Sequence, residues 1–166
     1  IGQGYTLVTP LQMASVASAI ANRGTRVQPM LVKATQTHNQ AVNDNPVVYA
    51  EKVELKHPEH WDTVINAMEK VIKYPRGTAH WINNPKSSFT MAGKTGTAQV
   101  YGIKQDETYD ANKIKAALRD HAWFIAFAPV EDPQIAIAVI IENSKGSPMV
   151  ARKILDAYFA GANNGQ

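Results

Sequence analysis

Two short apolar segments, residues 123–128 and 135–142, place the strongest constraint on the fold. The stretch between them ends in Asp132-Pro133, a dipeptide that interrupts a strand. Two apolar runs of this length on either side of so short a breaker predict an antiparallel β-hairpin. Small and large side chains alternate along both runs, and a strand face lined with alanine lets a helix approach closely. The alanines are Ala126, Ala128, Ala136 and Ala138.

Three helices are expected around this hairpin. The first begins at Pro10, with Thr9 as its N-cap, and ends at Gly24 in the C′ position. The second spans residues 57–73 and has an apolar stripe along one side. The third spans residues 149–159 and is expected to cover the alanines of the hairpin. Its apolar residues are Val150, Ile154, Leu155 and Tyr158.

A third strand is expected over residues 88–100, which are rich in Thr and Val and have small residues at their centre. Residues 36–46 are polar and predict a surface hairpin or connector. Residues 101–120 form a charged excursion, in which Asp110 could cap a short helix. Three adjacent antiparallel strands covered by helices give an α+β fold, and a chain of 166 residues suits one domain.

Composition excludes several kinds of site. The chain has no cysteine, so disulfides, thiolate-ligated zinc and a thiol nucleophile are excluded. The formal charge of +3 is small and no block of Lys and Arg stands out, which argues against a nucleic-acid partner. No apolar run approaches the roughly 18–20 residues that a membrane span requires.

The segment with the most chemical content is the Gly-Lys-Thr-Gly-Thr sequence at residues 93–97. Its first three residues match the end of a phosphate-binding loop. That motif also requires a glycine five positions before Gly93, where this chain has Ser88, and a helix directly after the Lys-Thr pair. Residues 95–100 are instead expected to form a strand. Spacing and context therefore both argue against a nucleotide site.

The same segment resembles the Lys-Thr-Gly motif of penicillin-recognising serine enzymes. Residues 77–79 resemble the Gly-Thr-Ala element of the class B penicillin-binding proteins, and the similarity extends from residue 1 to about residue 161. Residues 119–121, with the strand after them, resemble the elongation-specific members, penicillin-binding protein 2. The other segments that resemble the family are residues 1–5, 9–14 and 22–24.

The resemblance implies the transpeptidase fold shared by penicillin-binding proteins and serine β-lactamases, with residues 94–97 on an active-site strand. By position, Lys94 would shape the electrostatics of the cleft and assist proton transfer. Thr95 and Thr97 would hold the carboxylate of the substrate or of a β-lactam, and the Thr97 N–H would form half of an oxyanion hole. Gly96 would keep the strand edge open. No metal and no other cofactor is implied.

The resemblance also implies a cellular role. A peptidoglycan D,D-transpeptidase crosslinks stem peptides that end in D-Ala-D-Ala, through a serine acyl-enzyme that β-lactams also form. The implied location is the periplasmic face of the inner membrane, with an anchor outside this sequence. The implied partners are a SEDS-type glycosyltransferase and scaffold proteins of the elongation complex, and no nucleic acid.

The nucleophile of the family lies in a Ser-x-x-Lys motif, and its second motif is Ser-x-Asn. None of the six serines of this chain has Lys three positions later or Asn two positions later. The resemblance therefore implies that residues 1–166 are the C-terminal portion of a single transpeptidase domain, unable to form an acyl-enzyme alone. A serine β-lactamase and a non-catalytic β-lactam sensor or binding module remain as alternatives. The serines are Ser15, Ser18, Ser87, Ser88, Ser144 and Ser147.

The histidines are weaker candidates for chemistry. His57, His60 and His80 have no carboxylate-and-histidine cluster around them in the sequence, so a metal site is not expected. His121 follows Asp120, but an anchor between a loop and a strand end is favoured over a Ser-His-Asp triad.

Two loops also bear on the resemblance. Residues 104–119 carry mixed charges and are a candidate lid beside the cleft. Residues 143–148 are fewer than expected for the Gly-rich turn of the family. Either this loop is short or a few residues are missing from the sequence.

Overall fold

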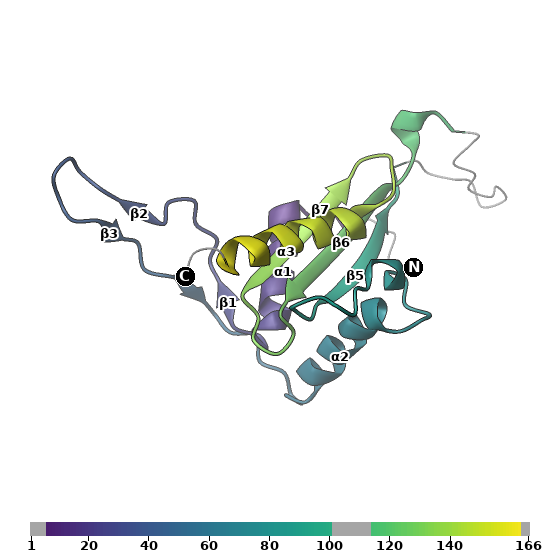
Figure 1. The fold of residues 1–166 in the computed structure, drawn as a ribbon, viewed down its shortest axis with the longest axis horizontal. Helices are drawn as coiled ribbons and strands as arrows, with labels where there is room; N and C mark the ends of the chain where they lie inside the picture. Colours follow the sequence, from purple (N-terminus) through teal and green to yellow (C-terminus); the bar gives the residue numbers. More distant parts are fainter. Residues whose placement is uncertain (1–5, 101–113, 164–166) are drawn as a thin grey trace.

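The computed structural model describes residues 6–100 and 114–163, and a three-stranded antiparallel sheet lies at its centre (Figure 1). The strands are ordered β5–β6–β7 and span Ala92–Ala98, His121–Ala128 and Ile135–Ile141. Helices α1 and α3 lie on opposite faces of this sheet, and α2 lies beside β5 (Figure 1). The three helices span Pro10–Ala21, His60–Lys73 and Ser147–Asn163. The predicted α+β fold and the β6–β7 hairpin are confirmed.

The alanines of the β6–β7 hairpin lie on both faces of the sheet. Ala126 of β6 packs in the cluster that contains Leu155 of α3, whereas Ala136 of β7 packs in the cluster that contains Ala21 of α1. In the register of the hairpin, Ala126 stands opposite Ile137, so a small residue on one strand lies beside a large one on the next. The expectation that the last helix covers all four alanines is therefore wrong, because two helices share them.

Helix α1 begins with the predicted cap but ends earlier than predicted. Gln12 N–H donates to Thr9 Oγ1 at 3.2 Å, and Thr9 N–H donates to Gln12 Oε1 at 2.8 Å, which completes a capping box. The last helical residue is Ala21. The left-handed C′ position predicted for Gly24 is occupied by Arg23, with φ 47°, and Gly24 follows with φ 92°.

Helix α2 begins at His60, three residues later than predicted. The N–H of His60 donates to the carbonyl of His57, and that of Trp61 to the carbonyl of Pro58. These i to i+3 bonds make the segment around Pro58 a tight turn rather than a first helical turn. The apolar stripe of the helix is buried as expected at three positions, Ile65, Met68 and Ile72.

Helix α3 is longer than predicted and turns a different side to the sheet. Its buried side runs through Ala151, Leu155 and Phe159, which belong to the cluster that contains Phe124 of β6. Residues four apart share one side of a helix, so burial of Leu155 fixes the other two. The remaining predicted contact residues are each at least 40% exposed. They are Val150, Ile154 and Tyr158.

Residues 25–55 form an arm that extends away from the body of the molecule (Figure 1). Its four strands are two residues long each, and they pair as β1 with β4 and β2 with β3. The surface hairpin predicted around residues 36–46 is confirmed. The strands of the arm are Arg26–Val27, Ala34–Thr35, Asn43–Asp44 and Tyr49–Ala50.

Strand β5 is shorter than the predicted strand over residues 88–100, and Thr90, which precedes it, contacts the turn between β6 and β7 through its side chain. Its hydroxyl oxygen accepts the Val130 N–H at 2.9 Å, and the hydroxyl donates to the Glu131 carboxylate. This second bond lowers the pKa of the Glu131 carboxyl below its ordinary value of 4.5. The start of β5 is thus tied to the turn between β6 and β7 rather than to a longer ladder.

The charged excursion between β5 and β6 lies partly outside the described residues. Asp110 is among the residues that are not described. The start of the predicted short helix lies in these undescribed residues, and the described part holds one 3₁₀ turn, Ala116–Leu118. Within residues 6–100 and 114–163, no helix has the length and apolar character needed to cross a membrane.

Candidate active site

The second half of β5 carries the predicted site residues on an open edge. Within the described residues, β6 is the only strand that pairs with β5. Lys94, Gly96 and Thr97 are exposed, and Thr95 is half-buried. The Lys94 ammonium donates to the Thr95 carbonyl oxygen at 2.7 Å. The structure therefore brings a cation and two hydroxyls together along one accessible strand.

The backbone of β5 adds a donor to this edge. In an antiparallel ladder the N–H and C=O of one residue point to the same side, and alternate residues share that side. The Thr95 carbonyl accepts from a side chain, which indicates that it faces the open edge. The N–H of Thr97, two residues further along, then faces the same way. An N–H in this position is suited to stabilise an oxyanion.

The two glycines of the strand have different reasons to be glycine. A Cβ on Gly93 would lie 2.5 Å from the ring of Phe124 and 2.9 Å from the Ile125 carbonyl oxygen, so a side chain is excluded by packing. A Cβ on Gly96 would meet only the Trp123 Cβ, at 3.2 Å. Gly93 is thus required by the sheet itself. At Gly96 the packing is less restrictive.

The Gly-Thr-Ala element at residues 77–79 docks on the C-terminal end of α2. A Cβ on Gly77 would lie 2.1 Å from the Val71 carbonyl oxygen, so only glycine fits without movement of the helix. Ala79 donates its N–H to the same carbonyl at 3.0 Å and is fully buried. His80 Nδ1 lies 3.1 Å from the Ile72 carbonyl oxygen. This turn satisfies carbonyls that the helix end would otherwise leave open.

The middle residue of this turn reaches strand β5. Thr78 Oγ1 lies 2.8 Å from Thr95 Oγ1, and either hydroxyl can be the donor. Sequence analysis identified both motifs but did not bring these two side chains together. The Gly-Thr-Ala element can be recognised in the sequence, but nothing in the sequence indicates that it lies beside β5.

A hollow next to this contact is lined by three cationic side chains, Lys70, Arg76 and Lys94. Thr78 also lines it. Among the described residues, no acidic side chain lines this hollow. Like charges that converge without a carboxylate favour an anionic ligand. The hollow thus agrees with a carboxylate-bearing substrate at the β5 edge.

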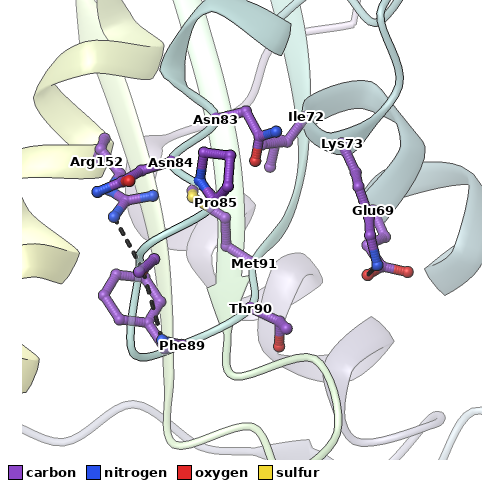
Figure 2. A pocket seen from close by; sticks show the side chains of 11 residues that line it. Glu69, Ile72, Lys73, Asn83, Asn84, Pro85, Phe89, Thr90, Met91 and Arg152 are labelled. Carbon is purple, nitrogen blue, oxygen red and sulfur yellow. Dashed lines mark hydrogen bonds and ion pairs between the residues drawn. The ribbon is translucent and has the colours of Figure 1, made fainter.

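A second hollow lies between α2, the start of β5 and α3 (Figure 2). Its one buried charge, Arg152, is 6% exposed and donates to both carboxylate oxygens of Asp156, at 2.9 and 3.0 Å. The guanidinium also donates to Ser87 Oγ at 2.9 Å and lies over the Phe89 ring (Figure 2). Lys73 pairs with Glu69 at 3.2 Å. These charges neutralise one another, in contrast to those of the first hollow.

The histidines have structural partners. His57 Nδ1 lies 3.2 Å from a carboxylate oxygen of Glu59, and its ring packs beside that of His60. In residues 6–100 and 114–163 no group of three or more His, Cys, Asp or Glu side chains is arranged to hold a metal ion.

His121 anchors the start of β6. The Asn143 N–H donates to His121 Nδ1 at 2.9 Å, and the Asn143 side-chain amide donates to the carbonyls of Ala117 and Arg119 at 3.0 and 2.8 Å. Asn143 has φ 54°, a left-handed backbone that Asn tolerates better than most residues. The expected role of His121 as an anchor between a loop and a strand is confirmed.

Most of the chain matches a known protein family. Residues 1–160 match the model of the penicillin binding protein transpeptidase domain. The chain belongs to the penicillin-binding protein transpeptidase family. Peptidoglycan D,D-transpeptidase MrdA of Escherichia coli K12 is 38% identical over 169 residues, which cover 99% of this chain and 26% of that protein. The chain thus spans about a quarter of the length of the curated relatives that it matches.

Solved structures agree with the family. Penicillin-binding protein 2 of Pseudomonas aeruginosa, in complex with WCK 5153, matches 95% of this chain and 32% of its own at 33% identity, with a TM-score of 0.71. The imipenem acyl-enzyme of penicillin-binding protein A from Mycobacterium tuberculosis matches the same shares at 27% identity and a TM-score of 0.70. Helicobacter pylori penicillin-binding protein 2 bound to MreC matches 99% and 26% at 27% identity, with a TM-score of 0.69. The resemblance to penicillin-binding protein 2 is confirmed.

Proposed function

We propose that the full protein is a peptidoglycan D,D-transpeptidase and that this chain supplies the wall of its active site formed by residues 94–97. The observation that carries the proposal is the open edge of β5. There Lys94, the hydroxyls of Thr95 and Thr97 and the Thr97 N–H follow one another along an accessible strand, and Lys94 also lines a hollow with the cations Lys70 and Arg76. A D-Ala carboxylate is the kind of group that such donors hold by charge-assisted hydrogen bonds.

The proposed reaction passes through a covalent intermediate. A serine outside this sequence attacks the carbonyl of the D-Ala-D-Ala bond and releases the terminal D-Ala. An amine of a neighbouring stem peptide then attacks the ester, which forms the crosslink and frees the serine. In both steps the Thr97 N–H would stabilise the negative charge on the carbonyl oxygen. Lys94 would stabilise the anionic groups of the substrate electrostatically and assist proton transfer.

The cellular setting is also a proposal. A transpeptidase of this kind would act at the periplasmic face of the inner membrane, together with a SEDS-type glycosyltransferase and elongation scaffold proteins. Its relation to the MreC-bound Helicobacter pylori protein supports a scaffold partner of that kind.

Labelling with a fluorescent penicillin tests the proposal. The full-length protein should be labelled covalently, and the label should be lost after substitution of the serine in its Ser-x-x-Lys motif. The 166-residue chain should remain unlabelled, because it has no such motif. Labelling of the short chain would show that the nucleophile had been assigned to the wrong part of the protein.

Two alternatives predict different behaviour. A serine β-lactamase would hydrolyse β-lactams with rapid turnover, whereas a transpeptidase would hold the acyl group and crosslink stem peptides. A β-lactam sensor would bind the drug but would not crosslink. The match of residues 1–160 to a transpeptidase model favours the first proposal. Measurement of β-lactam hydrolysis and of crosslinked product on the full-length protein separates all three.

A further inference from the structure

We propose that Thr78 is a positioning residue that directs the hydroxyl proton of Thr95 toward the substrate carboxylate. This inference rests on the proposed function, in which Thr95 holds that carboxylate. Its starting point is the distance of 2.8 Å between the two hydroxyl oxygens. The two residues are 17 positions apart and belong to different elements.

The direction of the hydrogen bond follows from the number of protons. A threonine hydroxyl has one proton to donate and can accept from others. When Thr95 donates its proton to a carboxylate, it can no longer donate to Thr78. Thr78 must then be the donor, and Thr95 accepts from it. A hydroxyl that already accepts a hydrogen bond is oriented and polarised for donation, so the pair forms a short relay.

Thr78 is held in place by both of its neighbours in the chain. Gly77 lies against the end of α2, where a Cβ would be 2.1 Å from a carbonyl oxygen. Ala79 is fully buried in the cluster of Phe124 and Leu155 and hydrogen-bonds to Val71. Because the turn is fixed on both sides, the hydroxyl of Thr78 is placed before any ligand arrives. Preorganisation of this kind reduces the cost of binding.

Thr78 also faces the ligand side of the strand. It is exposed and lines the same hollow as Lys94, Lys70 and Arg76. A merely structural contact between a turn and a strand would gain nothing from this position. We therefore expect the Thr78–Thr95 pair to act only on ligands that carry a carboxylate.

The first experiment measures acylation of the full-length protein by a fluorescent penicillin. Thr78→Val keeps the shape of the side chain and removes the hydroxyl, whereas Thr78→Ser keeps the hydroxyl. We expect a rate constant for acylation about three- to tenfold lower for Thr78→Val and within about twofold of the parent for Thr78→Ser. Thr78→Ala, which removes the methyl group as well as the hydroxyl, should behave as Thr78→Val does. The thermal midpoints of all three should stay close to that of the parent, because Thr78 is exposed.

A second experiment separates positioning from a general loss of structure. In a Thr95→Val background, Thr78→Val should cause no further loss, because the acceptor of its hydrogen bond is gone. A suitable donor substrate carries a thioester in place of the scissile D-Ala-D-Ala bond and keeps the terminal carboxylate. With this donor the loss should appear as a raised KM, and it should vanish when the terminal carboxylate is amidated. Rates for Thr78→Val equal to those of the parent, or equal losses in both backgrounds, would overturn the inference. Absence of labelling in the parent itself would instead overturn the proposed function.

Discussion

The body around β5 and the arm of residues 25–55 differ in the burial of their apolar side chains. In the body, α2, the turn at residues 77–79 and the sheet bury their apolar side chains in two clusters. In the arm, no residue is buried, and Leu31 is fully exposed. Both regions contain short apolar stretches in the sequence. What differs is whether another element covers them.

This difference explains why the candidate site belongs to the body. A hydrogen bond between Thr78 and Thr95 at 2.8 Å requires two elements that are each fixed in the packed body of the molecule, the turn through the first cluster and β5 through the second. Ala79 and Ala92 provide that fixation, since both are fully buried. The arm offers no comparable support, and its strands are only two residues long. The following substitutions compare the two regions in the full-length protein.

The largest effect is expected on stability from loss of a core side chain. Leu155→Ala removes a fully buried side chain between α3 and the sheet, which should cost about 2–5 kcal/mol of unfolding free energy. Leu31→Ala makes the same chemical change in the arm and should stay within about 0.5 kcal/mol. Denaturant unfolding measures both. Equal losses would mean that another part of the protein covers the arm.

The next effect concerns the rate of acylation. Lys94→Ala removes the cation at the β5 edge, and loss of a charge-assisted hydrogen bond of about 1.5–3 kcal/mol corresponds to a rate lower by about ten- to a hundredfold. Lys33→Ala removes an exposed cation of the arm and should leave the rate unchanged. Stopped-flow measurement of acylation by a β-lactam tests the pair. A near-normal rate for Lys94→Ala would remove this residue from the mechanism.

Two glycines sharpen the comparison further. Gly77→Ala pushes a methyl group against the Val71 carbonyl, and such overpacking costs about 1–3 kcal/mol and should also slow acylation by moving Thr78. Gly24→Ala at the base of the arm is also strained, with φ 92° and a Cβ 2.2 Å from the Val53 carbonyl oxygen. It should lower stability but leave the acylation rate of the folded protein unchanged. Equal slowing by both would show that the arm and the site are coupled.

The smallest effect is a dependence of stability on pH. The hydrogen bond from Thr90 lowers the pKa of Glu131, so its contribution is complete above pH 4.5 and is lost as the pH falls through the lowered value. Because Glu131 is largely exposed, the contribution should stay below about 1 kcal/mol. Thermal unfolding between neutral and acidic pH should show less acid destabilisation for Glu131→Gln than for the parent. Glu51→Gln, in the arm, is the control and should follow the parent.

Local signals in the sequence determined much of this protein. The capping box at Thr9, the breaker at Asp132-Pro133 and the apolar periodicity of α2 each act over a few neighbouring residues. The Lys-Thr-Gly motif and its edge strand could be predicted for the same reason, since the identity of nearby residues fixes them. Errors were largest at element ends, where Arg23 and the turn around Pro58 replaced the predicted boundaries.

Only the tertiary structure decided which side of each element meets its neighbours. The sequence of α3 offered two sides, and packing on Phe124 selected the one through Ala151 and Leu155. Likewise, nothing local connects Thr78 to Thr95, because their contact depends on how α2 ends and how its last carbonyls are covered. Periodicity and motifs are properties of neighbouring residues. A contact between residues distant in the chain exists only after the core has fixed both of them.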